Sequence, residues 1–222
     1  QGQGIGWGTL SFERGVIERE INAATDNPMR FDPGVAVSGG NFHGEPVGVV
    51  MDYLGIALAE TASISERRTF RLLDGHLNAD LPPMLVDRCE DAGLNSGLMM
   101  PQYTAASLVL ENRTLATPDS LHSLPTSAEQ EDHNANAMTA ARHTREIVAN
   151  TAHVLAIELF TASRALDLRK RINPAMAIGE GTVKAYQAIR KVVKYRPGDA
   201  LWGPDIDQIK TLLVKRVLED LI

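Results

Sequence analysis

Cysteine is almost absent from this sequence, since Cys89 is the only one among 222 residues. A single thiol excludes an intrachain disulfide, and a reducing compartment is the simplest inference, so we expect a cytoplasmic protein. Paired cysteines and His-Glu-x-x-His, the patterns typical of zinc sites, are also missing. His133, His143 and His153 lie ten residues apart, which turns each about 80° from the previous one around a helix. They would not converge on one ion, and we expect no metal site.

Basic residues are in deficit, with 22 Lys and Arg against 28 Asp and Glu and a formal net charge of -6. Nucleic-acid grooves and anionic membrane surfaces select clustered Lys and Arg, so neither is expected as the main partner. We find no apolar stretch approaching the roughly 20 residues that span a bilayer. The start, "QGQGIGWG", lacks the order of a signal peptide and is expected to be a loop because its glycines alternate.

Helical periodicity is what the sequence has in abundance, with 44% hydrophobic residues to form a core. Apolar residues recur three or four apart from Pro46 to about Leu73, and a second run covers roughly 97–112. Beyond Pro174 we expect a shorter helix to about Val193 and a terminal helix opened by Pro204.

The longest uninterrupted run should be a helix of some 40 residues, from just before Glu131 to about Leu168. Thr126 with Glu129, or Ser127 with Gln130, offers a capping box at its start. Seven alanines would let other helices approach closely, which favours a bundle and an oligomer. They are Ala135, Ala137, Ala140, Ala141, Ala149, Ala152 and Ala156.

Two positions stand out as candidates for a site. The stretch "SGGNFHGEPVG" predicts a tight loop that leads into a helix at Pro46 and exposes the large apolar side chain of Phe42. Glu131, in the first turn of the predicted long helix, would stay ionised at the positive end of the dipole and accept a substrate N–H or a proton. The alternative is that Glu131 only stabilises the helix start.

Several long segments resemble the second half of the aromatic amino acid ammonia-lyase family, and most of all its histidine ammonia-lyases. In order, they read "ATDNPMRF", "VSGGNFHGEPV", "SISERR", "GLNSGLMMPQYTAA", "SLPTSAEQEDH" and "NTAHVLAIELFTASRALDLR". The resemblance is strong from about Ile21 to Arg169 and looser to the C-terminus. One departure is "HNANAMTAARH", where the histidine enzymes commonly read "HVSMG".

The resemblance implies an all-α fold, a largely parallel bundle of long helices assembled as a homotetramer. It also implies a prosthetic group, 4-methylidene-imidazol-5-one, which forms from an internal Ala-Ser-Gly. This group activates the substrate amine. This chain contains no Ala-Ser-Gly. Residues 1–222 are therefore expected to be the C-terminal helical portion of such an enzyme, without the part that bears the prosthetic group, and inactive alone.

The resemblance assigns roles to four residues. Phe42 matches the phenylalanine that packs at the prosthetic ring and substrate, Met99 stands where phenylalanine ammonia-lyases have a lysine, and Glu131 matches the glutamate near the imidazole. The resemblance also assigns Gln130, in the same "QEDH" segment, to substrate binding. Because a carboxylate accepts an imidazole N–H and a phenyl ring offers none, we expect non-oxidative deamination of L-histidine to urocanate and ammonia. The alternatives are a phenylalanine or tyrosine ammonia-lyase, an aminomutase, or a non-catalytic helical scaffold subunit.

Overall fold

The computed structural model describes residues 2–91 and 93–219, which fall into two compact units. The first unit comprises Gln1–Thr61 and Glu111–Val148, and the second comprises Ala62–Leu110 and Ala149–Ile222. Three long helices contribute residues to both units, so each unit is described by itself.

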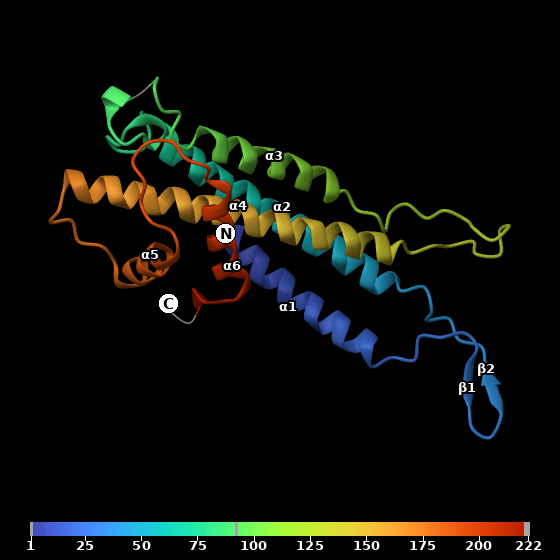
Figure 1. The fold of residues 1–222 in the computed structure, drawn as a ribbon. Helices are drawn as coiled ribbons and strands as arrows, with labels where there is room; N and C mark the ends of the chain where they lie inside the picture. The colour runs from blue at the N-terminus through green and yellow to red at the C-terminus, as the bar shows by residue number, and fades with distance from the viewer. Residues whose placement is uncertain (1, 92, 220–222) are drawn as a thin grey trace. The chain divides into compact units, whose positions relative to one another are not determined.

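Helices dominate the described residues, which confirms the expected all-α class (Figure 1). A two-stranded antiparallel hairpin pairs Met29 with Val37 and Phe31 with Val35. In chain order the elements are α1 (Gly2–Ile21), β1 (Met29–Phe31), β2 (Val35–Val37), α2 (Glu45–Leu73), α3 (Met99–Leu115), α4 (Ala137–Ile172), α5 (Glu180–Val192) and α6 (Gly203–Val214), with short 3-10 turns at Pro83–Leu85 and Cys89–Asp91.

Four helices lie where the sequence predicts them. α2 begins one residue before Pro46, α3 covers most of the second apolar run, and α5 ends next to Val193. α6 has Pro204 as its second residue, where the missing N–H costs no helical hydrogen bond. Periodicity and proline position together were sufficient to locate these helices.

The prediction of a loop at the N-terminus is wrong, because α1 is helical from Gly2. Glycine within a helix costs about 1 kcal/mol relative to alanine, so local propensity opposes this helix. Its three buried residues, Thr9, Glu13 and Val16, follow one another at helical spacing. Tertiary contact along this one face therefore overrides the local preference.

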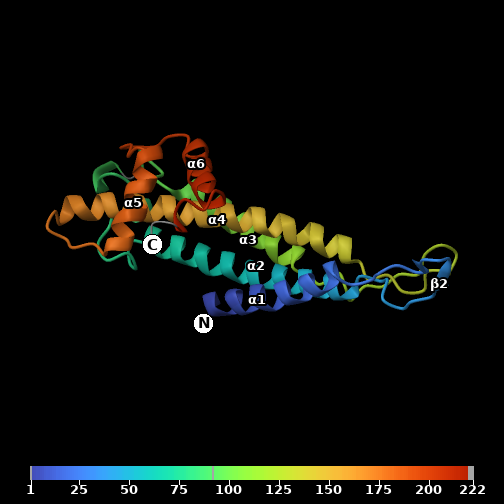
Figure 2. The ribbon, with the colours of Figure 1, turned by 90° about the horizontal axis from the view of Figure 1, so that it is seen from below.

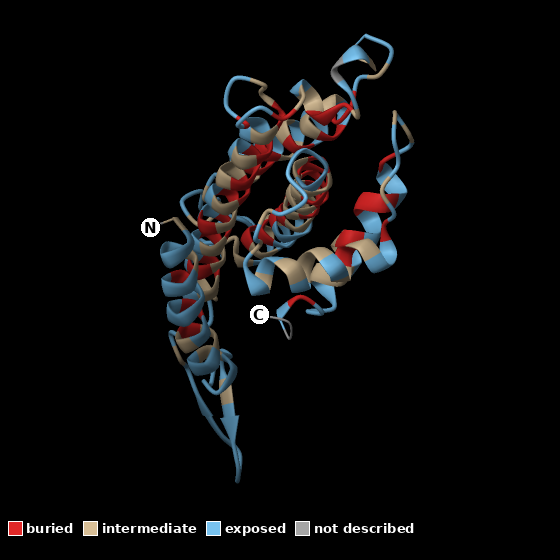
Figure 3. Ribbon diagram, turned by 90° about the vertical axis from the view of Figure 1, so that its left-hand side faces the viewer, coloured by how far each residue is buried: buried red, intermediate tan, exposed pale blue. Residues whose placement is uncertain are grey.

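In the first unit, α1 lies alongside the first half of α2 (Figures 1 and 2). The rings of Phe12 and Tyr53 meet edge to face with their centroids 6.2 Å apart. On α4, Thr144 Oγ1 donates to the backbone oxygen of Met51 at 2.7 Å. Most of α1 is partly or fully exposed, and every residue of the hairpin is exposed except Met29, which is partly buried (Figure 3).

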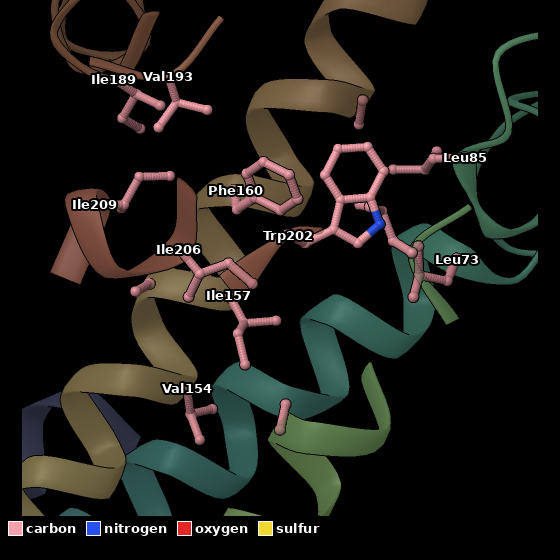
Figure 4. Packing of buried hydrophobic residues seen from close by; sticks show 14 of the residues in the cluster. Leu73, Leu85, Val154, Ile157, Phe160, Ile189, Val193, Trp202, Ile206 and Ile209 are labelled. Atoms are coloured by element: carbon pink, nitrogen blue, oxygen red, sulfur yellow. The ribbon is translucent and has the colours of Figure 1, made fainter. Parts of the chain in front are cut away.

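The second unit has the larger apolar core (Figure 4). Phe160 and Trp202 meet at its centre with ring centroids 5.5 Å apart, and aliphatic side chains of α4, α5 and α6 surround them. Arg68 and Ser65 on α2 both bind the carboxylate of Glu158 on α4, which adds a polar link beside the apolar core.

Contrary to expectation, α2 has the length and apolar composition of a membrane-spanning helix. Core helices of globular proteins pass the same test, and α2 has polar partners in both units. The carboxylate of Asp52 accepts hydrogen bonds from the backbone N–H groups of Asp119 and Ser120 in the first unit. In the second unit, Ser65 donates to Glu158 at 2.6 Å. These buried polar contacts are typical of a helix inside a protein core.

Candidate active site

The loop that carries Phe42, residues 38–44, turns sharply into α2. Gly44 has φ of +71°, a left-handed conformation that residues with a Cβ rarely adopt. Its carbonyl then accepts hydrogen bonds from the N–H groups of Val47 and Gly48 at 3.0 and 3.1 Å, which closes the first turn of α2. Phe42, two residues earlier, is 42% exposed. The loop therefore presents the ring at the surface of the first unit, as the sequence predicts.

The loop that carries Glu131 is a tight reversal. Thr126 and Glu131 exchange two backbone hydrogen bonds, Thr126 N to Glu131 O at 2.9 Å and Glu131 N to Thr126 O at 3.2 Å. Between them, Ser127, Ala128 and Glu129 all have positive φ, from 53° to 69°. Both Glu131 and its neighbour Gln130 are exposed.

The predicted helix start is therefore wrong, because α4 begins at Ala137, six residues after Glu131. The residues proposed for a capping box form the reversal instead. Asn136 also has positive φ, and the side chain of Asn134 accepts its N–H at 3.1 Å, a local bond that competes with helix formation. Glu131 is consequently held by the reversal and lies outside the first turn of the helix, where the dipole would act most strongly.

The two loops meet through histidine side chains. Nε2 of His133 lies 3.1 Å from Oε2 of Glu45, the first residue of α2. The rings of His133 and His43 meet edge to face with their centroids 5.1 Å apart. The rings of His43 and Phe42 are tilted to one another, with centroids 4.6 Å apart. His43, next to Phe42, and His133, two residues after Glu131, are thus in direct contact.

Two polar groups anchor the segment before α4. Asn136 Nδ2 donates to the carbonyl oxygens of Asp119 and His122. Oγ of Ser123 accepts the N–H of Asn134 at 2.9 Å. The asparagines of "HNANAM", where this chain departs from the resemblance, therefore shape the loop that carries Glu131.

Met99 is the first residue of α3 and is partly buried in the second unit. The structure thus brings Phe42, Gln130 and Glu131 into the first unit and places Met99 in the other unit.

Sequence reasoning missed the residues that join the loops, Glu45 and His133. The Glu-Pro pair at the start of α2 was the available signal for Glu45, because an acidic residue is favourable in a first helical turn. His133 was considered only as a metal ligand. Among the described residues no group of three or more His, Cys, Asp or Glu has an arrangement that could hold a metal ion.

A comparison with known families decides the family of the chain. Residues 1–191 match the family described as aromatic amino acid lyase. The chain belongs to the aromatic amino acid lyase family.

Similar proteins within this family include histidine ammonia-lyases and aminomutases. Histidine ammonia-lyase from Caldanaerobacter subterraneus subsp. tengcongensis is 52% identical over 185 residues, which cover 83% of this chain and 35% of the relative. The crystal structure of histidine ammonia-lyase from Trypanosoma cruzi superposes with a TM-score of 0.89 at 38% identity, over 98% of this chain and 42% of that one. The crystal structure of tyrosine aminomutase from Streptomyces globisporus gives a TM-score of 0.91 at 32% identity, over 100% of this chain and 41% of that one.

These likenesses confirm the expected fold, the long-helix bundle of the aromatic amino acid lyase type. The chain spans 35 to 42% of the length of the relatives it matches.

Proposed function

We propose that this chain is the C-terminal portion of a histidine ammonia-lyase that converts L-histidine to urocanate and ammonia. The observation that carries the proposal is the junction of the two loops, which places an exposed phenylalanine and an exposed carboxylate on neighbouring segments. An apolar ring and a carboxylate suit an imidazole, which has flat apolar faces and an N–H donor. The 52% identity with a histidine ammonia-lyase supports the same assignment.

The 4-methylidene-imidazol-5-one group would come from an Ala-Ser-Gly outside this chain, whose sequence contains none. The ring of Phe42 contacts His43 and is otherwise half-exposed, so its exposed part fits a flat heterocycle. When bound, the group supplies the electrophile that activates the amine of the substrate. Phe42 would pack against it and help to exclude water, while Gln130 would line the substrate in the same unit.

Glu131 would orient the substrate in this scheme. Its backbone is fixed on both sides by the hydrogen bonds to Thr126, so the carboxylate extends from a fixed point. An ionised carboxylate that accepts the imidazole N–H favours histidine over phenylalanine or tyrosine, whose rings offer no N–H. Glu131 is therefore the residue on which substrate choice should depend.

A chimeric enzyme tests this assignment. The matching segment of the Caldanaerobacter enzyme would be replaced by residues 1–222, and urocanate formation followed by its ultraviolet absorbance. We expect turnover by the chimera and none by the 222-residue chain alone. Glu131→Gln should lower kcat/KM for histidine about 100-fold, equivalent to about 3 kcal/mol for a charge-assisted hydrogen bond.

Glu129→Gln is the matched control, because Glu129 lies in the same reversal, is also exposed, and would lose the same charge. Its kcat/KM should stay within about twofold of the parent chimera. Equal losses in the two variants would remove the assigned role of Glu131. Turnover by the chain alone would show that no further polypeptide is needed, and an inactive, folded chimera would favour a scaffold subunit.

A lyase or aminomutase for tyrosine is the second candidate, favoured by the TM-score of 0.91 to a tyrosine aminomutase. The same chimera should then process tyrosine in preference to histidine, and Glu131→Gln should leave that activity intact.

We also propose a homotetramer in the cytoplasm. α1 exposes apolar side chains that another subunit would cover, among them Trp7, 74% exposed, and Phe12, 57% exposed. Light scattering of the active chimera should give four copies.

A further inference from the structure

Four basic side chains line one small cavity in the second unit. Arg164 comes from α4, Arg190 from α5, and Lys194 and Arg196 from the segment that follows α5. The cavity volume is about 10 Å³, which is roughly the space that one water-sized sphere requires.

Arg164 is nearly inaccessible, with 2% of its surface exposed. Its Nε donates to the carbonyl oxygen of Leu85 at 2.7 Å and its Nη1 to that of Arg196 at 2.8 Å. Nη2 is buried and has no hydrogen-bond partner. The rings of Tyr195 and Trp202 cover the guanidinium, with centroids 5.1 and 5.4 Å from its carbon. One donor of a buried cation that lines the cavity therefore remains unsatisfied.

Arg190 contributes a second unsatisfied donor. Its Nη2 binds Asp167 and its Nη1 donates to the carbonyl oxygen of Val193 at 3.1 Å. Its Nε is buried without a partner. Leaving one buried donor unpaired is costly, and two charged donors that line one cavity point to a shared acceptor.

The charge around the cavity is positive. Asp167 pairs with Arg190, and Asp205 lies 3.1 Å from Arg196. Among the described residues, neither Arg164 nor Lys194 has a carboxylate within 4.0 Å that would form an ion pair. The lining of the cavity thus carries four basic side chains and no carboxylate, and two of the four, Arg164 and Lys194, lack an ion-pair partner. Asp87 and Asp199 act on Arg164 from farther away.

Burial lowers the pKa of Arg164, the dominant effect on this group. The phenol of Tyr195 and the carboxylates of Asp87, Asp167 and Asp199 act in the opposite direction but do not cancel it. An acceptor with negative charge would compensate this buried cation better than a neutral water.

We propose that this cavity binds one chloride ion, held by Nη2 of Arg164 and Nε of Arg190. Sulfate, phosphate and carboxylate ligands are larger than chloride and would require a greater movement of the walls, so a monatomic anion fits best. The exposed side chains of Lys194 and Arg196 form part of the wall and can shift outward slightly to admit an ion larger than water. The ion joins α4, α5 and the segment before α6, so its role is to stabilise the second unit.

Thermal unfolding of the 222-residue chain at constant ionic strength is the first test. Sodium gluconate, whose anion is too large for the cavity, is exchanged stepwise for sodium chloride. We expect a saturable rise in Tm of about 3 to 6 °C when chloride exceeds its Kd about tenfold. A Tm that does not depend on chloride overturns the proposal.

Arg164→Gln should abolish the chloride response. Arg169→Gln is the matched control: Arg169 is on the same helix and donates to the carbonyl oxygen of Asn78 at 2.9 Å, away from the cavity. This variant should keep the full response, and equal responses in the two variants would overturn the assignment. If Arg164→Gln does not fold, crystals of the unchanged chain grown in bromide decide. An anomalous peak between Arg164 and Arg190 supports the site, and a water there refutes it.

Discussion

Glu13 on α1 offers a stability test that depends on pH. Its side chain is 4% exposed, and its Oε1 is buried without a hydrogen-bond partner. Burial raises the pKa of this carboxyl from 4.5 to about 7. The folded chain therefore holds the proton more tightly than the unfolded chain does.

The direction of the effect follows from linkage. Protonated Glu13 contributes its full stability below about pH 4.5, and this contribution is lost as the pH rises through about 7. A rise of one pKa unit corresponds to about 1.4 kcal/mol, so the rise from 4.5 to about 7 changes the free energy of unfolding by about 3 kcal/mol at most. Solvent screening reduces this to about 1 to 3 kcal/mol. Glu13→Gln keeps the shape of the side chain but cannot ionise. The variant should therefore keep, at all pH values, the stability that the parent has with Glu13 protonated.

Urea unfolding of the chain at pH 5, 6, 7 and 8 measures this difference. Glu13→Gln should match the parent within about 0.5 kcal/mol at pH 5 and exceed it by about 1 to 3 kcal/mol at pH 8, with unchanged m-values. Glu18→Gln is the matched control, because Glu18 is an exposed acid on the same helix. Glu18→Gln should not reproduce the gain in stability at pH 8. A Glu13→Gln variant no more stable than the parent at pH 8 would refute the reasoning.

Two further predictions concern the loop junction and α3. In the chimera, Glu45→Ala should raise KM for histidine up to about 10-fold with kcat less affected, because His133 loses a charge-assisted partner, and Glu45→Gln should restore part of the loss. Steady-state kinetics that leave KM unchanged would contradict this. Gly97→Ala should cost about 2 to 4 kcal/mol in urea unfolding, since φ is +59° and a Cβ would lie 2.3 Å from the carbonyl oxygen of Met84. Gly93→Ala, at φ +93° with no atom within 4 Å, should cost only about 1 kcal/mol.

Local signals located the helices whose sequence and packing agree. The apolar spacing of α2 and the proline in the first turn of α6 act within a few residues, so they could be recognised without the fold. α1 shows the limit of such signals. Its glycines oppose the helix locally, and the contacts of Thr9 and Val16 that favour it arise only once the chain has folded.

The start of α4 could not be predicted for a related reason. Thr126 with Glu129 satisfies the capping pattern, but the pattern does not specify the backbone conformation that follows. Three residues with positive φ and the asparagine bond before Ala137 decide against a helix there. No sequence period encodes the junction between Glu45 and His133, because it joins residues 88 positions apart.

The position of Glu131 also changes how its chemistry should be understood. In the first turn of a helix, the carboxylate would owe its charge to the dipole within this chain. On the exposed reversal it is hydrated, and hydrogen bonds to a hydrated carboxylate contribute little. Selectivity for an imidazole N–H requires that water be excluded, and the half-exposed Phe42 lies on a surface equally open to solvent. If Glu131 has the proposed role, we expect the walls that exclude water to come from another polypeptide segment, which is the physical reason to expect no turnover by residues 1–222 alone.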